Sequence, residues 1–210
     1  MPNRLPIPAI VAVLAIVFGL WRIVAFLVED PPPFSDYEER IGMELGALVS
    51  ELSGPGRVIV LVPDYDGGLP PHQQARLEGL GKRLAKEPDE RTVVAQPVRV
   101  DPMNAQTGRD VFGAGAFLDA LRAWPEGETS AVVSLVGPPG GLATLQRAWS
   151  DRHPPVIVLA VYDESVGQLM KAGIVHGAIT PRSGSREDVD VSQWKDPHQA
   201  RFHREYQVRR

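Results

Sequence analysis

The sequence predicts an α/β protein, in which an N-terminal transmembrane helix is followed by a three-layer Rossmann-like domain with a five-stranded parallel sheet. Two observations support this fold class. Residues 5–28 form an apolar run with a single charge. After residue 56, five short apolar runs alternate with four amphipathic segments. This alternation is typical of right-handed β-α-β crossovers and favours the strand order 2-1-3-4-5.

The first apolar run predicts a membrane anchor over residues 1–30. As a helix that rises about 1.5 Å per residue, residues 5–28 would extend for roughly 36 Å, which exceeds a bilayer core of about 30 Å. The alternatives are a cleaved signal peptide and a buried core helix. The run is longer than the apolar region of a signal peptide, and no small-residue cleavage site follows it. It also lacks the polar face of most core helices.

Charges beside the run predict its orientation. Arg4 precedes it, whereas acidic residues follow it before Arg40. The basic side of a span faces the cytoplasm, so we expect the rest of the chain outside it, in the periplasm beside a bacterial inner membrane. Trp21 and Arg22 lie near the outer end of the run. They either anchor the helix among lipid headgroups or contact a partner helix within a complex.

Residues 31–56 predict a proline-rich linker and an amphipathic helix. Three consecutive prolines break the preceding helix, and Ser35 and Glu38 have the spacing of a capping box. Apolar residues then recur every three or four positions, at Tyr37, Ile41, Leu45, Leu48 and Leu52. We therefore expect a helix that ends before Ser53 and either packs against the domain, which is the commoner case, or lies near the membrane.

Residues 57–184 predict the α/β domain. Strands are expected at 57–63, 92–100, 130–136, 156–161 and 175–180, and helices at 71–86, 111–124, 142–150 and 165–172. Pro97 places the second strand at a sheet edge or a bulge, because proline cannot donate to a ladder. Residues 185–210 predict a polar loop and a basic-aromatic arm.

Composition excludes several function classes. The formal net charge of −4 provides no basic surface for nucleic acid. The absence of cysteine excludes disulfides, thiolate metal sites and a thiol nucleophile. The histidines have no metal-binding spacing, so neither a metal nor a cofactor is expected.

Four segments carry a resemblance to a known family. They are residues 58–61 (VIVL), 131–137 (AVVSLVG), 155–159 (PVIVL) and 165–179 (SVGQLMKAGIVHGAI). With them, residues 57–184 resemble one lobe of a sugar-type periplasmic binding protein of the type 1 fold, in which a similar helix–glycine–strand step closes the lobe. The resemblance implies a solute-binding function, although that family binds solute between two lobes and one is present here.

Polar side chains follow four of the predicted strands. Asp64 and Asp66 come after the first strand, Asp101 after the second, Asp163 after the fourth and Arg182 after the fifth. The carboxyl ends of parallel strands meet at one edge, so these residues form the candidate ligand rim.

The segment LVPDYDGG also resembles the first motif of haloacid-dehalogenase-like phosphatases. This resemblance implies Asp64 as nucleophile and Asp66 as acid/base, with Asp163 and Glu164 near magnesium. The set is incomplete, because Ser134 is expected inside its strand rather than at the tip, and no lysine lies between residues 87 and 170. Aspartates before glycines are also common turn formers. We therefore expect no enzyme activity.

The loop Gly137–Gly141 precedes a predicted helix, a position at which backbone amides can hold an anion. Pro138 and Pro139 remove two of the N–H donors, so a structural loop is expected.

The C-terminal tail combines aromatic and basic side chains. Its aromatic residues are Trp194, Phe202 and Tyr206, and its basic residues include Arg201 and Arg204. The tail either docks on its own domain or contacts a partner protein or anionic headgroups.

The leading hypothesis from sequence is a single-pass, non-catalytic accessory or scaffolding subunit of a larger membrane complex. Its expected partners are the lipid bilayer and the other subunits. The alternative is a membrane-tethered solute-binding or sensor domain, and a magnesium phosphatase is a third hypothesis.

Overall fold

The computed structural model describes residues 34–64, 68–100, 112–124, 129–149, 153–160, 164–182, 190 and 192–210. The predicted anchor, including Trp21 and Arg22, lies outside these residues. None of the helices in the described part of the chain has the length and apolar character that a membrane span requires. Residues 35–210 form one compact unit, whose architecture follows.

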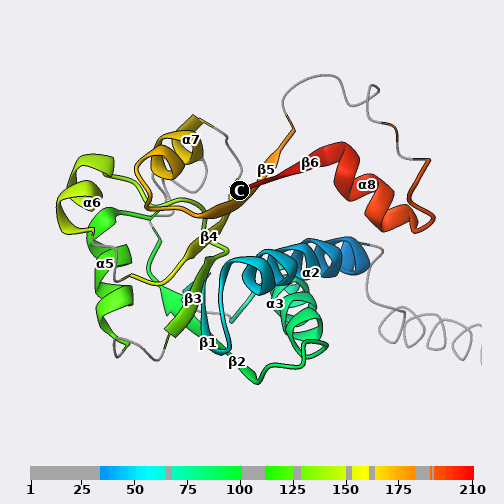
Figure 1. The fold of residues 1–210 in the computed structure, drawn as a ribbon, viewed down its shortest axis with the longest axis horizontal. Helices are drawn as coiled ribbons and strands as arrows, with labels where there is room; N and C mark the ends of the chain where they lie inside the picture. The colour runs from blue at the N-terminus through cyan, green and yellow to red at the C-terminus, as the bar shows by residue number, and fades with distance from the viewer. Residues whose placement is uncertain are drawn as a thin grey trace, which may run out of the picture. The chain divides into compact units, whose positions relative to one another are not determined.

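Within the described residues, six strands form one sheet in the order β2-β1-β3-β4-β5-β6 (Figure 1). They are β1 (Gly56–Pro63), β2 (Arg91–Val98), β3 (Thr129–Ser134), β4 (Val156–Leu159), β5 (Gly177–Pro181) and β6 (Tyr206–Arg209). The first five are parallel and confirm the predicted order. β6 was not predicted, and it pairs antiparallel with β5.

Six helices are described. They are α2 (Phe34–Leu52), α3 (Pro71–Leu84), α5 (Ala114–Arg122), α6 (Leu142–Ala148), α7 (Glu164–Lys171) and α8 (Pro197–Glu205). The predicted capping box is wrong, because α2 already includes Ser35, whose hydroxyl donates to Asp36 Oδ1 at 3.4 Å. Glu38 instead accepts from Arg76 Nε at 2.5 Å.

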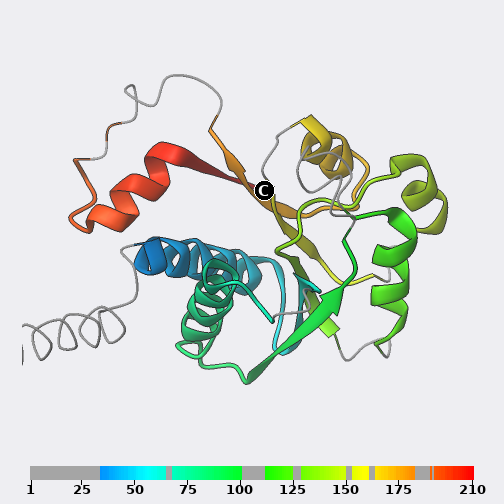
Figure 2. The ribbon, with the colours of Figure 1, turned by 180° about the vertical axis from the view of Figure 1, so that it is seen from behind.

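The helices cover both faces of the sheet, as a three-layer domain requires (Figures 1 and 2). Val58 and Val60 of β1 pack with residues of α2, α3 and α8, whereas Ile59 and Leu61 pack with residues of α5, α6 and α7. Successive strand side chains alternate between faces, so a strand covered on both sides reads as a continuous apolar run. This explains why β1 was recognisable from sequence.

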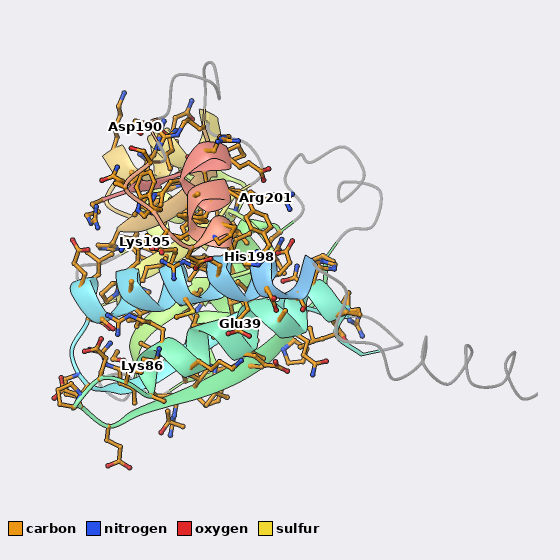
Figure 3. The ribbon with its side chains drawn as sticks, turned by 90° about the vertical axis from the view of Figure 1, so that its right-hand side faces the viewer. Glu39, Lys86, Asp190, Lys195, His198 and Arg201 are labelled. Atoms are coloured by element: carbon orange, nitrogen blue, oxygen red, sulfur yellow. The ribbon has the colours of Figure 1, made fainter. Side chains whose placement is uncertain are left out.

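Two glycines bring α2 and α3 into backbone contact. A Cβ built on Gly42 would lie 2.0 Å from Arg76 O, and one built on Gly79 would lie 2.0 Å from Glu39 O. Figure 3 labels Glu39 at this crossing. No side chain fits between the helices at these positions, so the crossing requires glycine on both of them.

β2 is an edge strand, which confirms the prediction from Pro97. Glu90 O accepts from Gly56 N–H, and Val98 O accepts from Asp64 N–H. In a parallel ladder the polar groups of alternate residues point to the same neighbour, so the even-numbered residues of β2 face β1. The nitrogen of Pro97 therefore points away from the sheet, and its missing N–H costs no ladder bond.

The C-terminal arm, defined here as α8 with β6, docks on its own domain. Phe202 is fully buried among residues of α2 and the sheet, so it belongs to the interior of this chain rather than to an exposed surface. Its ring stacks on Tyr206 with centroids 5.7 Å apart. Arg210 Nε also lies 2.7 Å from Glu51 Oε1, beyond the end of β6.

The remaining predicted contact residues of the tail are more accessible. Trp194 is half-buried and stacks on His203, with centroids 4.0 Å apart. Arg201 and Arg204 are exposed on α8. A role for these three residues in contacting a partner or headgroups stays a prediction.

Candidate ligand site at the carboxyl edge of the sheet

The winding of the chain reverses between β1 and β3. The chain leaves β1 for α3 on one face and leaves β3 for α6 on the other, although β1 and β3 are neighbours in the sheet. The two connections therefore lead to opposite faces of the sheet. In open α/β sheets this reversal is the usual position of a ligand site.

The β1 side of the reversal begins with Asp64. Its N–H donates to Val98 O at 2.9 Å, which fixes the backbone, and its side chain is exposed. Pro70 then turns the chain into α3, where its carbonyl accepts from Gln73 and Gln74 N–H at 2.9 and 3.0 Å. Asp66 lies outside the described residues.

The β3 side is a fixed loop. Ser134 hydroxyl donates to Gly137 O at 2.6 Å in a buried position, and Gly140 N–H donates to Phe112 O at 2.7 Å. Gly137 and Gly141 have φ values of +99° and +76°, which favour glycine. The loop is therefore built to hold one conformation.

Ser134 corrects one sequence expectation. β3 ends at Ser134 rather than at residue 136, so this residue is at the strand tip and not inside the strand. Its buried hydroxyl already donates to Gly137 O. The site therefore lacks a free hydroxyl at this strand end, a group that the phosphatase motif requires.

Gln73 is a candidate site residue that the sequence analysis missed. It lies in the first turn of α3, on the inward stripe that also carries Leu77, Leu80 and Leu84, and it is 7% exposed. Its Oε1 has no hydrogen-bond partner among the described residues. A polar residue within an otherwise apolar helical stripe is the sequence signal that would have found it.

Arg182 shares the edge with Asp64 but does not meet it. Three strand spacings separate β1 from β5, which is roughly 14 Å. The Nε of Arg182 donates to His203 O at 3.1 Å, and its backbone N–H donates to Glu205 O at 2.9 Å. The guanidinium is therefore bound to α8. Asp101 and Asp163 lie outside the described residues, so the full predicted rim stays a prediction.

Arg99, which directly follows β2, is an exposed basic side chain near the β1 side of the reversal. His72 lies at the start of α3, where desolvation and then the nearby Arg76 guanidinium lower its pKa, so it is uncharged at neutral pH. Among the described residues no group of three or more metal-ligating side chains occurs. Asp64 is the acidic side chain described at the end of β1.

The chain matches no protein-family model, and no curated protein matches its sequence. Among solved structures it is similar to a carbohydrate transporter solute-binding protein from Agrobacterium radiobacter in complex with D-arabinose, with 19% identity, a TM-score of 0.47, and coverage of 71% of this chain and 48% of that one. An ABC transporter solute-binding protein from Burkholderia graminis C4D1M, also with D-arabinose, gives 19% identity, a TM-score of 0.47, and coverage of 68% and 47%.

A putative LacI transcriptional regulator from Bacteroides fragilis gives 12% identity, a TM-score of 0.49, and coverage of 69% and 47%. The chain therefore spans about half the length of the solved structures it matches. These structures include solute-binding proteins of carbohydrate and other ABC transporters, the class that residues 57–184 were predicted to resemble.

Proposed function

We propose that this domain binds a small, hydroxyl-rich solute at the carboxyl edge of its sheet and acts as a solute-binding or sensor module. The observation that carries the proposal is the reversal between β1 and β3, where an exposed carboxylate lies beside a fixed loop. The predicted anchor would tether the module outside the cytoplasm. The module is proposed to be non-catalytic.

The groups described at the carboxyl edge of the sheet favour a solute that carries hydrogen-bond donors. Pro70 and Pro71 on one side and Pro138 and Pro139 on the other have no N–H. Further backbone donors are already bonded within the protein, at Leu135, Gly140, Gln73 and Gln74. Asp64 adds a negatively charged acceptor. An anion would meet repulsion from this carboxylate, whereas solute hydroxyl groups would donate to it.

The expected result is thermal stabilisation of the full-length protein by millimolar pentoses or hexoses, and none by inorganic phosphate. A ligand that binds the folded state alone at about 100 times its Kd adds roughly 2.7 kcal/mol of stability. Asp64→Asn should weaken the affinity roughly 10- to 100-fold, because it removes a charged acceptor. Isothermal titration calorimetry with the responding sugar measures this loss.

Asp119→Asn is the matched control, because Asp119 is an exposed aspartate on α5, on the opposite face from α3. Its affinity should equal that of the unaltered protein. Stabilisation by phosphate but not by sugars, or equal affinity in the two variants, would contradict the proposal.

The exposure of Asp64 favours a second candidate. A single sheet edge can cover only one side of a ligand, whereas small-molecule sites usually bury most of the ligand surface. A second protein surface would therefore complete the site, as the accessory-subunit hypothesis also requires. Purification from native membranes in mild detergent should retain a stoichiometric partner. Migration as a single protein would count against this candidate without affecting the sugar titration.

A further inference from the structure

The first turns of α2 are held between two elements that each reach the carboxyl edge of the sheet. On one side, α3 begins at Pro71 after the β1 loop, and its Arg76 Nε lies 2.5 Å from Glu38 Oε2. On the other side, the hydroxyl of Tyr37 donates to Glu205 Oε2 of α8 at 2.6 Å. Figure 3 shows α2 between α3 and α8.

The contacts with α8 form a connected set. Arg201 Nε donates to Glu205 Oε1 at 3.0 Å, and its guanidinium carbon lies 4.1 Å from the centroid of the Tyr37 ring. His198 Nε2 lies 3.8 Å from Asp36 Oδ2. Tyr37 is 3% exposed, and its burial raises its pKa, so the phenol keeps the proton that it donates.

The same end of α8 is bonded to the carboxyl end of β5. Arg182, which directly follows β5, donates its backbone N–H to Glu205 O and its Nε to His203 O. The backbone carbonyl of Glu205 therefore accepts a hydrogen bond from Arg182, and its carboxylate accepts one from Tyr37. This residue joins the edge of the sheet to the start of α2.

We propose that these contacts form a clamp that couples the carboxyl edge of the sheet to the first turns of α2, where the chain continues into residues 1–33. A solute or partner surface that engages the edge changes how firmly α3 and α8 hold α2. This inference rests on the proposed function for what engages the edge. The coupling itself is tested without any solute, so its failure is distinguishable from that of the proposed function.

The experiment is hydrogen exchange of the full-length protein in detergent, with Arg182→Ala as the variant. Amides 38–41 are the readout, because they are the first in α2 whose N–H groups bond within the helix. Both Arg182 bonds described here go to α8. The clamp nevertheless predicts exchange about five- to tenfold faster at amides 38–41, because loss of the bond from Arg182 Nε to His203 O loosens the end of α8 that carries Glu205.

Arg147→Ala is the matched control. Arg147 Nε donates to Ala143 O at 3.1 Å, the same kind of bond and the same length as that from Arg182 Nε to His203 O. It lies on α6, on the other face of the sheet. Exchange at amides 38–41 should be unchanged in this variant.

The reciprocal variant is Tyr37→Phe, which should accelerate exchange in β6 and at the Arg182 amide by a similar factor, because coupling is mutual. In both variants the amides of α5 and α7 should keep their protection. If Arg182→Ala does not fold, Arg182→Lys replaces it, with the same amides as readout. Faster exchange in α8 alone, or equal acceleration at amides 38–41 in Arg147→Ala, would overturn the clamp.

Discussion

Gly79→Ala is expected to lower the free energy of unfolding by about 3 kcal/mol or more. The added methyl group would lie 2.0 Å from Glu39 O, which is backbone and cannot rotate away. The helices must therefore separate, and α2 carries part of the core through Ile41 and Leu45, both fully buried. Urea denaturation followed by circular dichroism measures the loss.

The matched control for this substitution is Gly81→Ala. Gly81 lies on the same helix, but a Cβ built there meets nothing within 4 Å. Alanine should therefore be neutral or add up to about 1 kcal/mol through helix propensity. If Gly79→Ala is as stable as Gly81→Ala, α2 and α3 do not cross in backbone contact.

Phe202→Ala is expected to cost about 3–5 kcal/mol. Phe202 has no exposed surface and packs with Tyr37 and the other core residues on the α2 face of the sheet. Its truncation leaves a cavity between the arm and the domain. The substitution should therefore also speed hydrogen exchange throughout β6, the part of the arm that pairs with β5.

Arg204→Ala serves as the control, since Arg204 is exposed on the same helix. Its effect should stay within about 0.5 kcal/mol. A small effect of Phe202→Ala would show that the arm does not dock on α2. The tail would then be free for the partner contact that the sequence left open.

The central fold was predictable because β1, β3 and β4 are covered on both faces and therefore read as continuous apolar runs. The inward face of α2 was predictable from the spacing of Tyr37 and Ile41. β6 was not, because the alternation of Tyr206 and Val208 with polar residues extends over only four positions, too few to predict a strand. It forms by pairing with β5, which is a tertiary effect.

The position of Asp64 after β1 was predictable, but the contacts of the neighbouring residues were not. The alternation of strands and helices places Asp64 at the carboxyl edge, and the structure confirms that position. Spacing alone could not reveal that α8 would engage Arg182, because that contact depends on where the tail docks. Nor could it place Ser134 at the strand tip with a bonded hydroxyl, since local propensity defines strand ends poorly.

The central claim is that solute binds at the reversal between β1 and β3. The most direct test is a nuclear magnetic resonance titration of the isotope-labelled, full-length protein in detergent with a pentose, a hexose and inorganic phosphate. We predict that a sugar shifts the amide resonances of Asp64 and of the non-proline residues within 68–73 and 135–141, and that phosphate leaves them unchanged. Sugar titrations that move no resonance, or that move only resonances at the opposite edge near Arg57 and Arg91, would contradict the claim.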